Sequence, residues 1–150
     1  MRYSVVLISQ PGAIPWLLKK ITRSPWNHVG LIDDSGLIRD LDWSGPGTYR
    51  MEDRPTWKFL VLPLDVTCSW LSRVHSLYKY KLTQNLNWLF AQLGSSRSVY
   101  ESESPKKNCV GLVADVFRFP HWAALAPGEF ERRHFHGVLE CTADCRQADR

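Results

Sequence analysis

The chain has 150 residues, of which 44% are hydrophobic and 23% are charged. These proportions exclude collagen-like, coiled-coil and disordered classes, and the length favours one domain over residues 1–150 that needs no disulfide or metal to fold. The formal net charge is +4, but the basic residues are scattered, which argues against a nucleic-acid-binding protein.

Four apolar runs in the first half of the chain have the composition of β-strands. They span residues 3–8, 28–32, 37–41 and 58–64. The second and third flank Asp33-Asp34-Ser35-Gly36, a strong hairpin signal, and Pro63 places the end of the fourth at a sheet edge. Pro15 opens a short predicted helix over 16–21, with Leu17 and Ile21 on one face. The Gly- and Pro-rich stretch 43–56 predicts a loop.

Helical periodicity replaces strand-like patterns in the second half of the chain. It predicts helices over 70–78, behind Thr67 as N-cap, over 86–93, and over 110–117 before Pro120. Residues 121–150 are less regular and predict a C-terminal extension. The expected fold class is therefore α+β, with a small antiparallel sheet packed against helices.

Cys109 is the first candidate for chemistry, because it stands at the start of a predicted helix directly behind Asn108, the expected N-cap. The positive end of a helix dipole favours a thiolate, which is the nucleophilic form of cysteine, and Lys106 and Lys107 add positive charge. The alternative is a small buried residue on the inner face of the helix.

His28 is the candidate base for such a nucleophile. If the hairpin loop comprises Asp33 to Ser35, with Gly36 in the left-handed conformation, Asp40 lies directly across from His28 on the same sheet face. A shifted loop would bring Asp42 opposite instead. A carboxylate in this position can hold the imidazole in one tautomer and orientation.

The segments SPWNHVGLI, LIRDLD and NCVGLVADVF together resemble the circularly permuted NlpC-like branch of the papain-like cysteine hydrolases, which includes YiiX-type proteins and lecithin:retinol acyltransferase. In that branch the histidine hairpin precedes the cysteine helix. His28, Gly30, Leu31-Ile32 and Asp40 match its motif, although the acyltransferases carry a second histidine where this chain has Asp40. The resemblance covers roughly residues 1–118.

The resemblance implies a permuted papain-like fold and a cysteine hydrolase that cleaves an amide or ester bond without a cofactor. Peptidoglycan peptide bonds are the first expected substrate class, ahead of other amides, isopeptides and lipid esters. Trp26, Trp43 and Tyr80 are candidate substrate-binding residues. The Cys109 amide, with Tyr78, Tyr80 or Tyr100, could form an oxyanion hole.

Small members of this group also occur in phages, so the alternative is an inert structural protein, such as a phage tail or virion component, whose partners are other virion proteins. No apolar run reaches the length of a signal-peptide core or a membrane span. We therefore expect synthesis in the cytoplasm, with association with a virion left open.

The C-terminal spacing of His134, His136, Cys141 and Cys145 supplies ligand types that suit zinc, but it lacks a paired C-x₂-C knuckle. We expect no metal site there. The cysteines of an unexported chain are expected to be free thiols, with a Cys141–Cys145 disulfide as the minor alternative.

Overall fold

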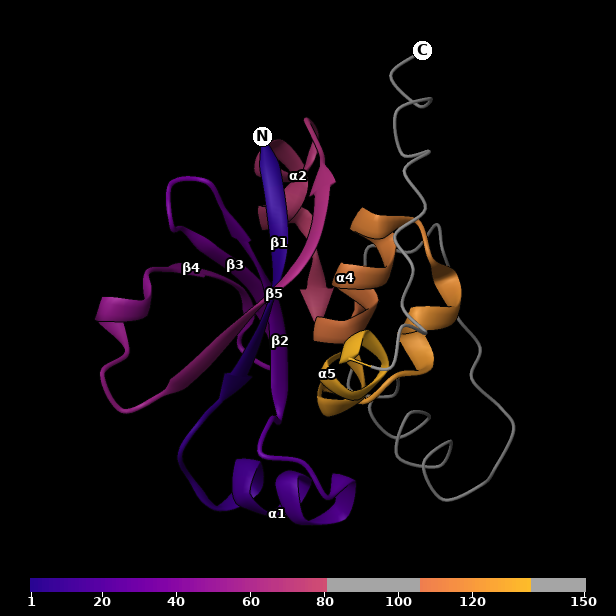
Figure 1. Cartoon of the computed structure of the whole chain (residues 1–150). Coiled ribbons are helices and arrows are strands. Elements are labelled where there is room, and N and C mark those ends of the chain that lie inside the picture. The colour runs from indigo at the N-terminus through magenta and orange to yellow at the C-terminus, as the bar shows by residue number, and fades with distance from the viewer. Residues whose placement is uncertain (81–105, 136–150) are drawn as a thin grey trace.

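The computed structural model describes residues 1–80 and 106–135 (Figure 1). Its main sheet has five strands in the order β4-β3-β2-β1-β5, and every neighbouring pair is antiparallel. The strands are β1 (Arg2–Ser9), β2 (His28–Asp33), β3 (Ile38–Asp42), β4 (Gly45–Tyr49) and β5 (Lys58–Thr67). A short parallel pair, β6 (Lys79–Tyr80) and β7 (Lys106–Lys107), lies outside this sheet. The predicted α+β class with a small antiparallel sheet is confirmed.

The central strand β1 is buried on both faces and separates two apolar clusters. Val5 and Leu7 belong to the main core, whereas Val6 and Ile8 belong to a smaller cluster, as the alternation of side chains along a strand requires. Helices α4 (Cys109–Phe117) and α5 (Pro127–Phe135) lie together on one side of the sheet in Figure 1. The main core therefore lies between the sheet and these helices.

The predicted loop over 43–56 is wrong, because β4 and the 3₁₀-helix η1 (Met51–Asp53) lie within it. Gly45, Pro46 and Gly47 are all part of β4, which pairs with β3 through Asp42, Leu41 and Asp40. β4 is the outermost strand of the sheet, where a proline without an N–H group is tolerated.

Pro63 marks an irregularity within β5 and not its end. The register with β1 shifts between the pairs Val5–Leu62 and Ser4–Asp65, so residues 63 and 64 form a bulge. Because β5 then continues to Thr67, which pairs with Arg2, Thr67 cannot be the predicted N-cap. The helix predicted over 70–78 is accordingly shorter and consists of α2 (Leu71–Val74) followed by the 3₁₀-helix η2 (His75–Leu77).

The predicted helix over 110–117 is confirmed as α4, whereas the extension beyond it is more regular than expected as far as Phe135. The 3₁₀-helix η3 (Pro120–Ala124) and α5 enclose Trp122, whose ring centroid lies 5.4 Å from that of Phe130 in an edge-to-face contact. Burial of this aromatic pair ties the segment to the core. The helix predicted over 86–93 and the end of the chain from residue 136 lie outside the described residues.

Helix α1 (Ala13–Thr22) begins before Pro15, earlier than predicted. It lies between β1 and β2 in the chain and beyond the ends of both strands in Figure 1. The face that carries Leu17 and Ile21 is exposed and does not join the core.

Candidate active site

Cys109 occupies the predicted position at the first turn of α4. The side chain of Asn108 caps the helix by accepting a hydrogen bond of 2.8 Å from the Gly111 amide, as predicted. The thiol is half-buried, and α4 packs against β2 and β3. Lys107 does not contribute the free positive charge expected beside the cysteine, because its buried ammonium group lies 2.9 Å from the Asp115 carboxylate.

His28 and Asp40 form a buried pair on the neighbouring strands β2 and β3. The Nε2 atom of His28 lies 2.8 Å from Oδ2 of Asp40, and the two residues are only 5% and 1% exposed. This is the contact that the hairpin argument predicted. Because Asp40 engages Nε2, the other ring nitrogen, Nδ1, is the one left for Cys109.

The strand register that produces this contact differs from the predicted one. Leu31 pairs with Arg39 and Ile32 pairs with Ile38, so the same register continued along the strands places Asp40 across from Gly30 rather than from His28. The loop comprises residues 34–36, because the Asp33 amide still pairs with the Leu37 carbonyl. Gly36 takes the expected left-handed conformation, with φ 78°. Asp40 therefore reaches His28 along the diagonal between the two strands.

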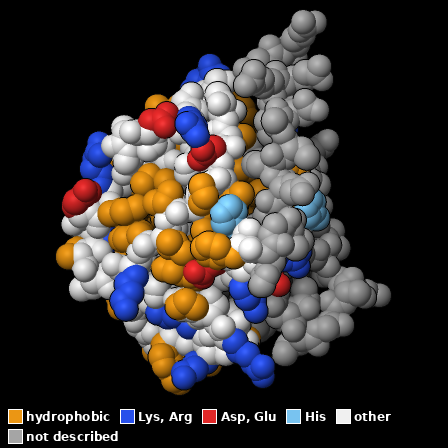
Figure 2. Space-filling model, viewed as in Figure 1, with side chains coloured by type: hydrophobic (Ala, Val, Ile, Leu, Met, Phe, Trp, Pro, Cys, Tyr) orange, Lys and Arg blue, Asp and Glu red, His pale blue; other side chains and the backbone are white. Residues whose placement is uncertain are grey.

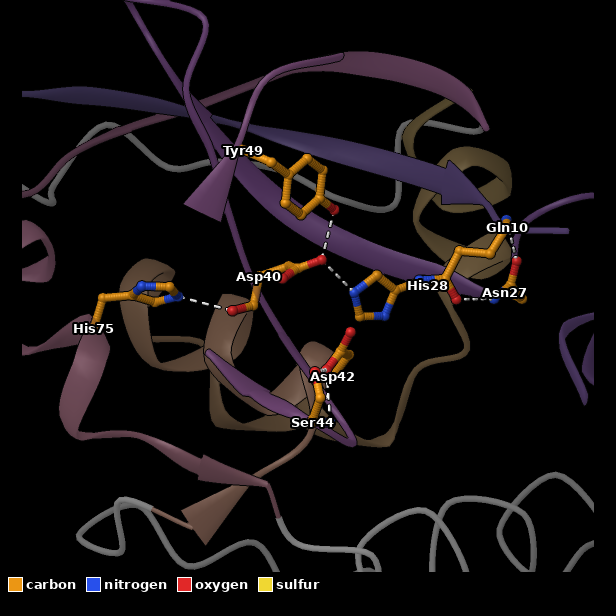
Figure 3. A network of polar contacts seen from close by, with 8 residues as sticks. All are labelled: Gln10, Asn27, His28, Asp40, Asp42, Ser44, Tyr49 and His75. Carbon is orange, nitrogen blue, oxygen red and sulfur yellow. Dashed lines mark hydrogen bonds and ion pairs between the residues drawn. The ribbon is translucent and has the colours of Figure 1, made fainter. Parts of the chain in front are cut away.

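The continued register brings Asp42 across from His28, as the alternative loop would have done. The Asp42 carboxylate, however, accepts hydrogen bonds from the backbone and hydroxyl of Ser44 (Figure 3). In the structure it is therefore Asp40, and not Asp42, that holds His28.

Glycines on both neighbouring strands make room for the Asp40 side chain. A Cβ atom at Gly30 would lie 3.1 Å from the Asp40 Cβ, and one at Gly47 would lie only 2.4 Å from its Oδ1. Neither glycine has a positive φ, so the need is for space and not for backbone freedom. The resemblance noted Gly30, but Gly47 lay in a segment predicted to be a loop.

Tyr49 is a third member of the network that sequence reasoning missed. Its hydroxyl donates a hydrogen bond of 2.6 Å to the same Asp40 oxygen that His28 contacts, and both side chains point toward this carboxylate in Figure 3. Burial alone would raise the pKa of Asp40, but the hydrogen bonds from His28 and Tyr49 and the charge of His28 hold it below its usual value. The other oxygen, Oδ1, has no hydrogen-bond partner among the described residues.

His28 responds to Cys109 as well as to Asp40. Burial lowers the pKa of His28, but the charge of Cys109 and hydrogen bonding to Asp40 and Cys109 outweigh burial and raise the pKa well above 6.5. The imidazolium form is therefore favoured at neutral pH, beside a cysteine whose negative form it stabilises. The structure thus brings Cys109, His28 and Asp40 together.

His75 supports the network from outside the sheet, and no sequence signal pointed to it. Its Nε2 donates a hydrogen bond of 2.7 Å to the backbone carbonyl of Asp40 (Figure 3). Burial lowers the pKa of His75, more strongly than the nearby Asp40 raises it. His75 is therefore a neutral donor at neutral pH, in contrast to His28.

The predicted substrate-binding residues occupy three different settings. Trp43 is 71% exposed in the turn between β3 and β4. Trp26 packs against the main core and donates a hydrogen bond of 2.5 Å from its indole to Glu131 on α5. Tyr80, on β6, is half-buried against the same core, and β6 contacts β3 and β4.

The candidates for a second oxyanion donor are reduced by the structure. The Tyr78 hydroxyl donates to the Asp115 carboxylate at 3.1 Å, so its only O–H group is engaged there. Tyr80 remains a candidate, and Tyr100 lies outside the described residues. The Cys109 amide lies in the first turn of α4, where backbone N–H groups have no partner within the helix.

Within residues 1–80 and 106–135, no group of three or more His, Cys, Asp or Glu side chains could hold a metal ion. Of the C-terminal zinc-ligand candidates, His134 lies on α5 and the other three lie outside this part of the chain. In the same part of the chain, no helix has the length and apolar character needed to cross a membrane. Comparisons with protein-family models, curated proteins and solved structures give no significant match.

Gly47→Ala tests the space around Asp40. The added methyl group would overlap Oδ1, so the carboxylate must rotate or β4 must shift. We expect the variant to lose about 1–3 kcal/mol of unfolding free energy and the pKa of His28 to fall. Urea denaturation and NMR titration of the imidazole measure the two effects. Thr48→Ala, at an exposed position of the same strand, should change neither. An unaltered His28 titration in Gly47→Ala would contradict this account of the niche.

The two histidines should shape the pH dependence of stability in opposite directions. Because the folded pKa of His75 lies below 6.5, its contribution is present above that pH and is lost as the pH falls. Because the folded pKa of His28 lies above 6.5, its contribution is present below that pH and is lost as the pH rises. Urea denaturation across this range should show a shallower acid decline in His75→Gln and a shallower alkaline decline in His28→Gln. The same slopes in both variants and the wild type would refute these protonation states.

Proposed function

We propose that the protein is a cysteine hydrolase that cleaves an amide or ester bond, with Cys109 as nucleophile, His28 as general acid and base, and Asp40 as the residue that orients His28. The observation that carries the proposal is the buried chain of interactions from Cys109 through His28 to Asp40. A nucleophile, a base and a group that fixes the base are the three components that acyl transfer requires.

The reaction begins with the Cys109 thiolate paired to the His28 imidazolium. The sulfur attacks the substrate carbonyl carbon, and the oxygen that becomes negative is held by the Cys109 amide at the start of α4. When the carbon–nitrogen or carbon–oxygen bond of the substrate breaks, His28 gives its proton to the leaving group. The product of this half-reaction is a thioester on Cys109.

Water completes the cycle. Neutral His28 takes a proton from the attacking water, the thioester bond breaks, and the acid product leaves with the thiolate–imidazolium pair restored. Asp40 stays ionised throughout and holds Nε2, so the same ring nitrogen serves both steps. No cofactor enters this scheme.

The proposed substrate class rests on the resemblance to the permuted NlpC-like branch. It places peptidoglycan peptides first, and peptide or cell-wall fragments are the substrates to assay. The exposed Trp43 beside β3 and β4 offers an aromatic surface for such a ligand.

Selective alkylation of Cys109 tests the proposal without knowledge of the substrate. With limiting iodoacetamide at mildly acidic pH, Cys109 should react first, as mapped by mass spectrometry, because His28 stabilises its thiolate. His28→Gln should slow this labelling roughly 10- to 100-fold. His121→Gln, at an exposed histidine of η3, is the matched control and should have no effect. Labelling of Cys109 that does not depend on His28 would instead favour the inert structural protein.

Asp40→Asn tests the orienting carboxylate. The amide cannot accept the same hydrogen bonds, so we expect turnover of a chromogenic ester or peptide to fall roughly 10- to 1,000-fold. Asp42→Asn is the matched control, because the Asp42 carboxylate bonds to Ser44 and not to His28. Circular dichroism establishes that both variants fold. A loss in Asp42→Asn without a loss in Asp40→Asn would overturn the assignment.

A further inference from the structure

Helix α1 exposes more large apolar side chains than any other described element. Ile14, Trp16, Leu17 and Ile21 are 53%, 59%, 51% and 41% exposed. Ile14, Leu17 and Ile21 follow helical spacing and form one stripe, which we call the α1 stripe. Figure 2 shows apolar side chains flanked by basic ones at the lower end of the molecule, where Figure 1 places α1.

The charges around the α1 stripe are all positive in sequence. Residues 10–23 contain Lys19, Lys20 and Arg23 but no Asp or Glu. Lys19 holds α1 to the end of β1, because its ammonium group donates to the Gln10 carbonyl at 2.8 Å and to the Ser9 hydroxyl at 3.0 Å. Lys20 is exposed, and its Nζ lies 5.8 Å from the centre of the Trp16 ring. The apolar surface is thus bordered by cations.

The size of the α1 stripe argues against a second protein chain as its occupant. A helix of ten residues is about 15 Å long, and a stable protein interface buries about 800 Å² on each partner, far more than one face of such a helix offers. A bilayer needs no complementary protein surface. It accepts a short apolar stripe at the boundary between headgroups and acyl chains, and anionic headgroups attract nearby Lys and Arg residues.

We propose that α1 docks the protein on the surface of an anionic lipid bilayer, with Ile14, Leu17 and Ile21 inserted at the boundary and Lys20 and Arg23 among the lipid phosphates. This is an interfacial contact and not a span. It depends on the geometry of α1 alone and is independent of the proposed hydrolase activity.

Docking through α1 would also orient the rest of the molecule. The chain enters and leaves the α1 segment through Gln10 and Asn27, which are joined by two side-chain hydrogen bonds of 2.8 and 2.9 Å. The adjoining strand residues Ile8 and His28 pair with each other. The end of the sheet that carries His28 would therefore be the end nearest the bilayer.

Co-sedimentation of the full chain with vesicles tests the proposal. The wild type should bind vesicles made of equal parts phosphatidylglycerol and phosphatidylcholine, bind phosphatidylcholine vesicles more weakly, and lose affinity for the anionic vesicles at high salt. Leu17→Ser should weaken partitioning about tenfold, because it removes inserted apolar surface. Lys20→Gln should weaken it about fivefold on anionic vesicles and have little effect on neutral ones.

Leu77→Ser is the matched control, because Leu77 is also an exposed leucine, 65% accessible, but lies on η2 and not on α1. It should leave partitioning unchanged. The proposal is overturned if the wild type binds neither vesicle, or if Leu77→Ser is impaired as strongly as Leu17→Ser. Light scattering provides a further test, since a dimer that Leu17→Ser dissociates would show that the occupant is a second copy of the chain.

Discussion

The buried carboxylate of Asp40 is the constraint on which the arrangement of the site depends. An ionised group that is 1% exposed is stable only where donors and positive charge compensate the loss of water. His28 and Tyr49 supply both interactions at a single oxygen, and His75 binds the backbone carbonyl of the same residue. Strands β2, β3 and β4 and the 3₁₀-helix η2 are thereby joined at one point.

The two histidines around Asp40 differ in protonation because they meet different parts of it. His28 faces the carboxylate and the Cys109 sulfur, and negative charge raises its pKa in spite of burial. His75 faces a neutral carbonyl, where burial prevails and lowers its pKa. One residue thus holds a charged histidine on its side chain and a neutral one on its backbone. Of the two, only His28 is also coupled to Cys109, so His28 alone is suited to exchange protons with a substrate.

The sequence predicted the elements with strong local signals and missed those that long-range packing determines. Asn108 as helix cap, Gly36 in the hairpin turn and the contact of His28 with Asp40 all follow from local rules. The register was misjudged because Asp33 was counted as a loop residue, whereas its backbone still pairs with Leu37. Strand β4 was missed because its glycines and proline resemble a loop, although Gly47 is there to make space for Asp40. Tyr49 and His75 have no signal of their own, since their roles exist only once Asp40 is buried.

The energetics of this network bear on the choice between an enzyme and an inert scaffold. A buried ion pair seldom stabilises a fold more than apolar residues of similar volume would, and leaving one partner uncompensated is strongly destabilising. Here the sheet holds the His28–Asp40 pair, commits Tyr49 and His75 to the same residue, gives up side chains at Gly30 and Gly47, and leaves Asp40 Oδ1 without a hydrogen-bond partner among the described residues. A fold that needed only stability at this point could fill it with aliphatic side chains. The cost is understandable if His28 must be held in one orientation beside Cys109, which is why the network supports a catalytic role.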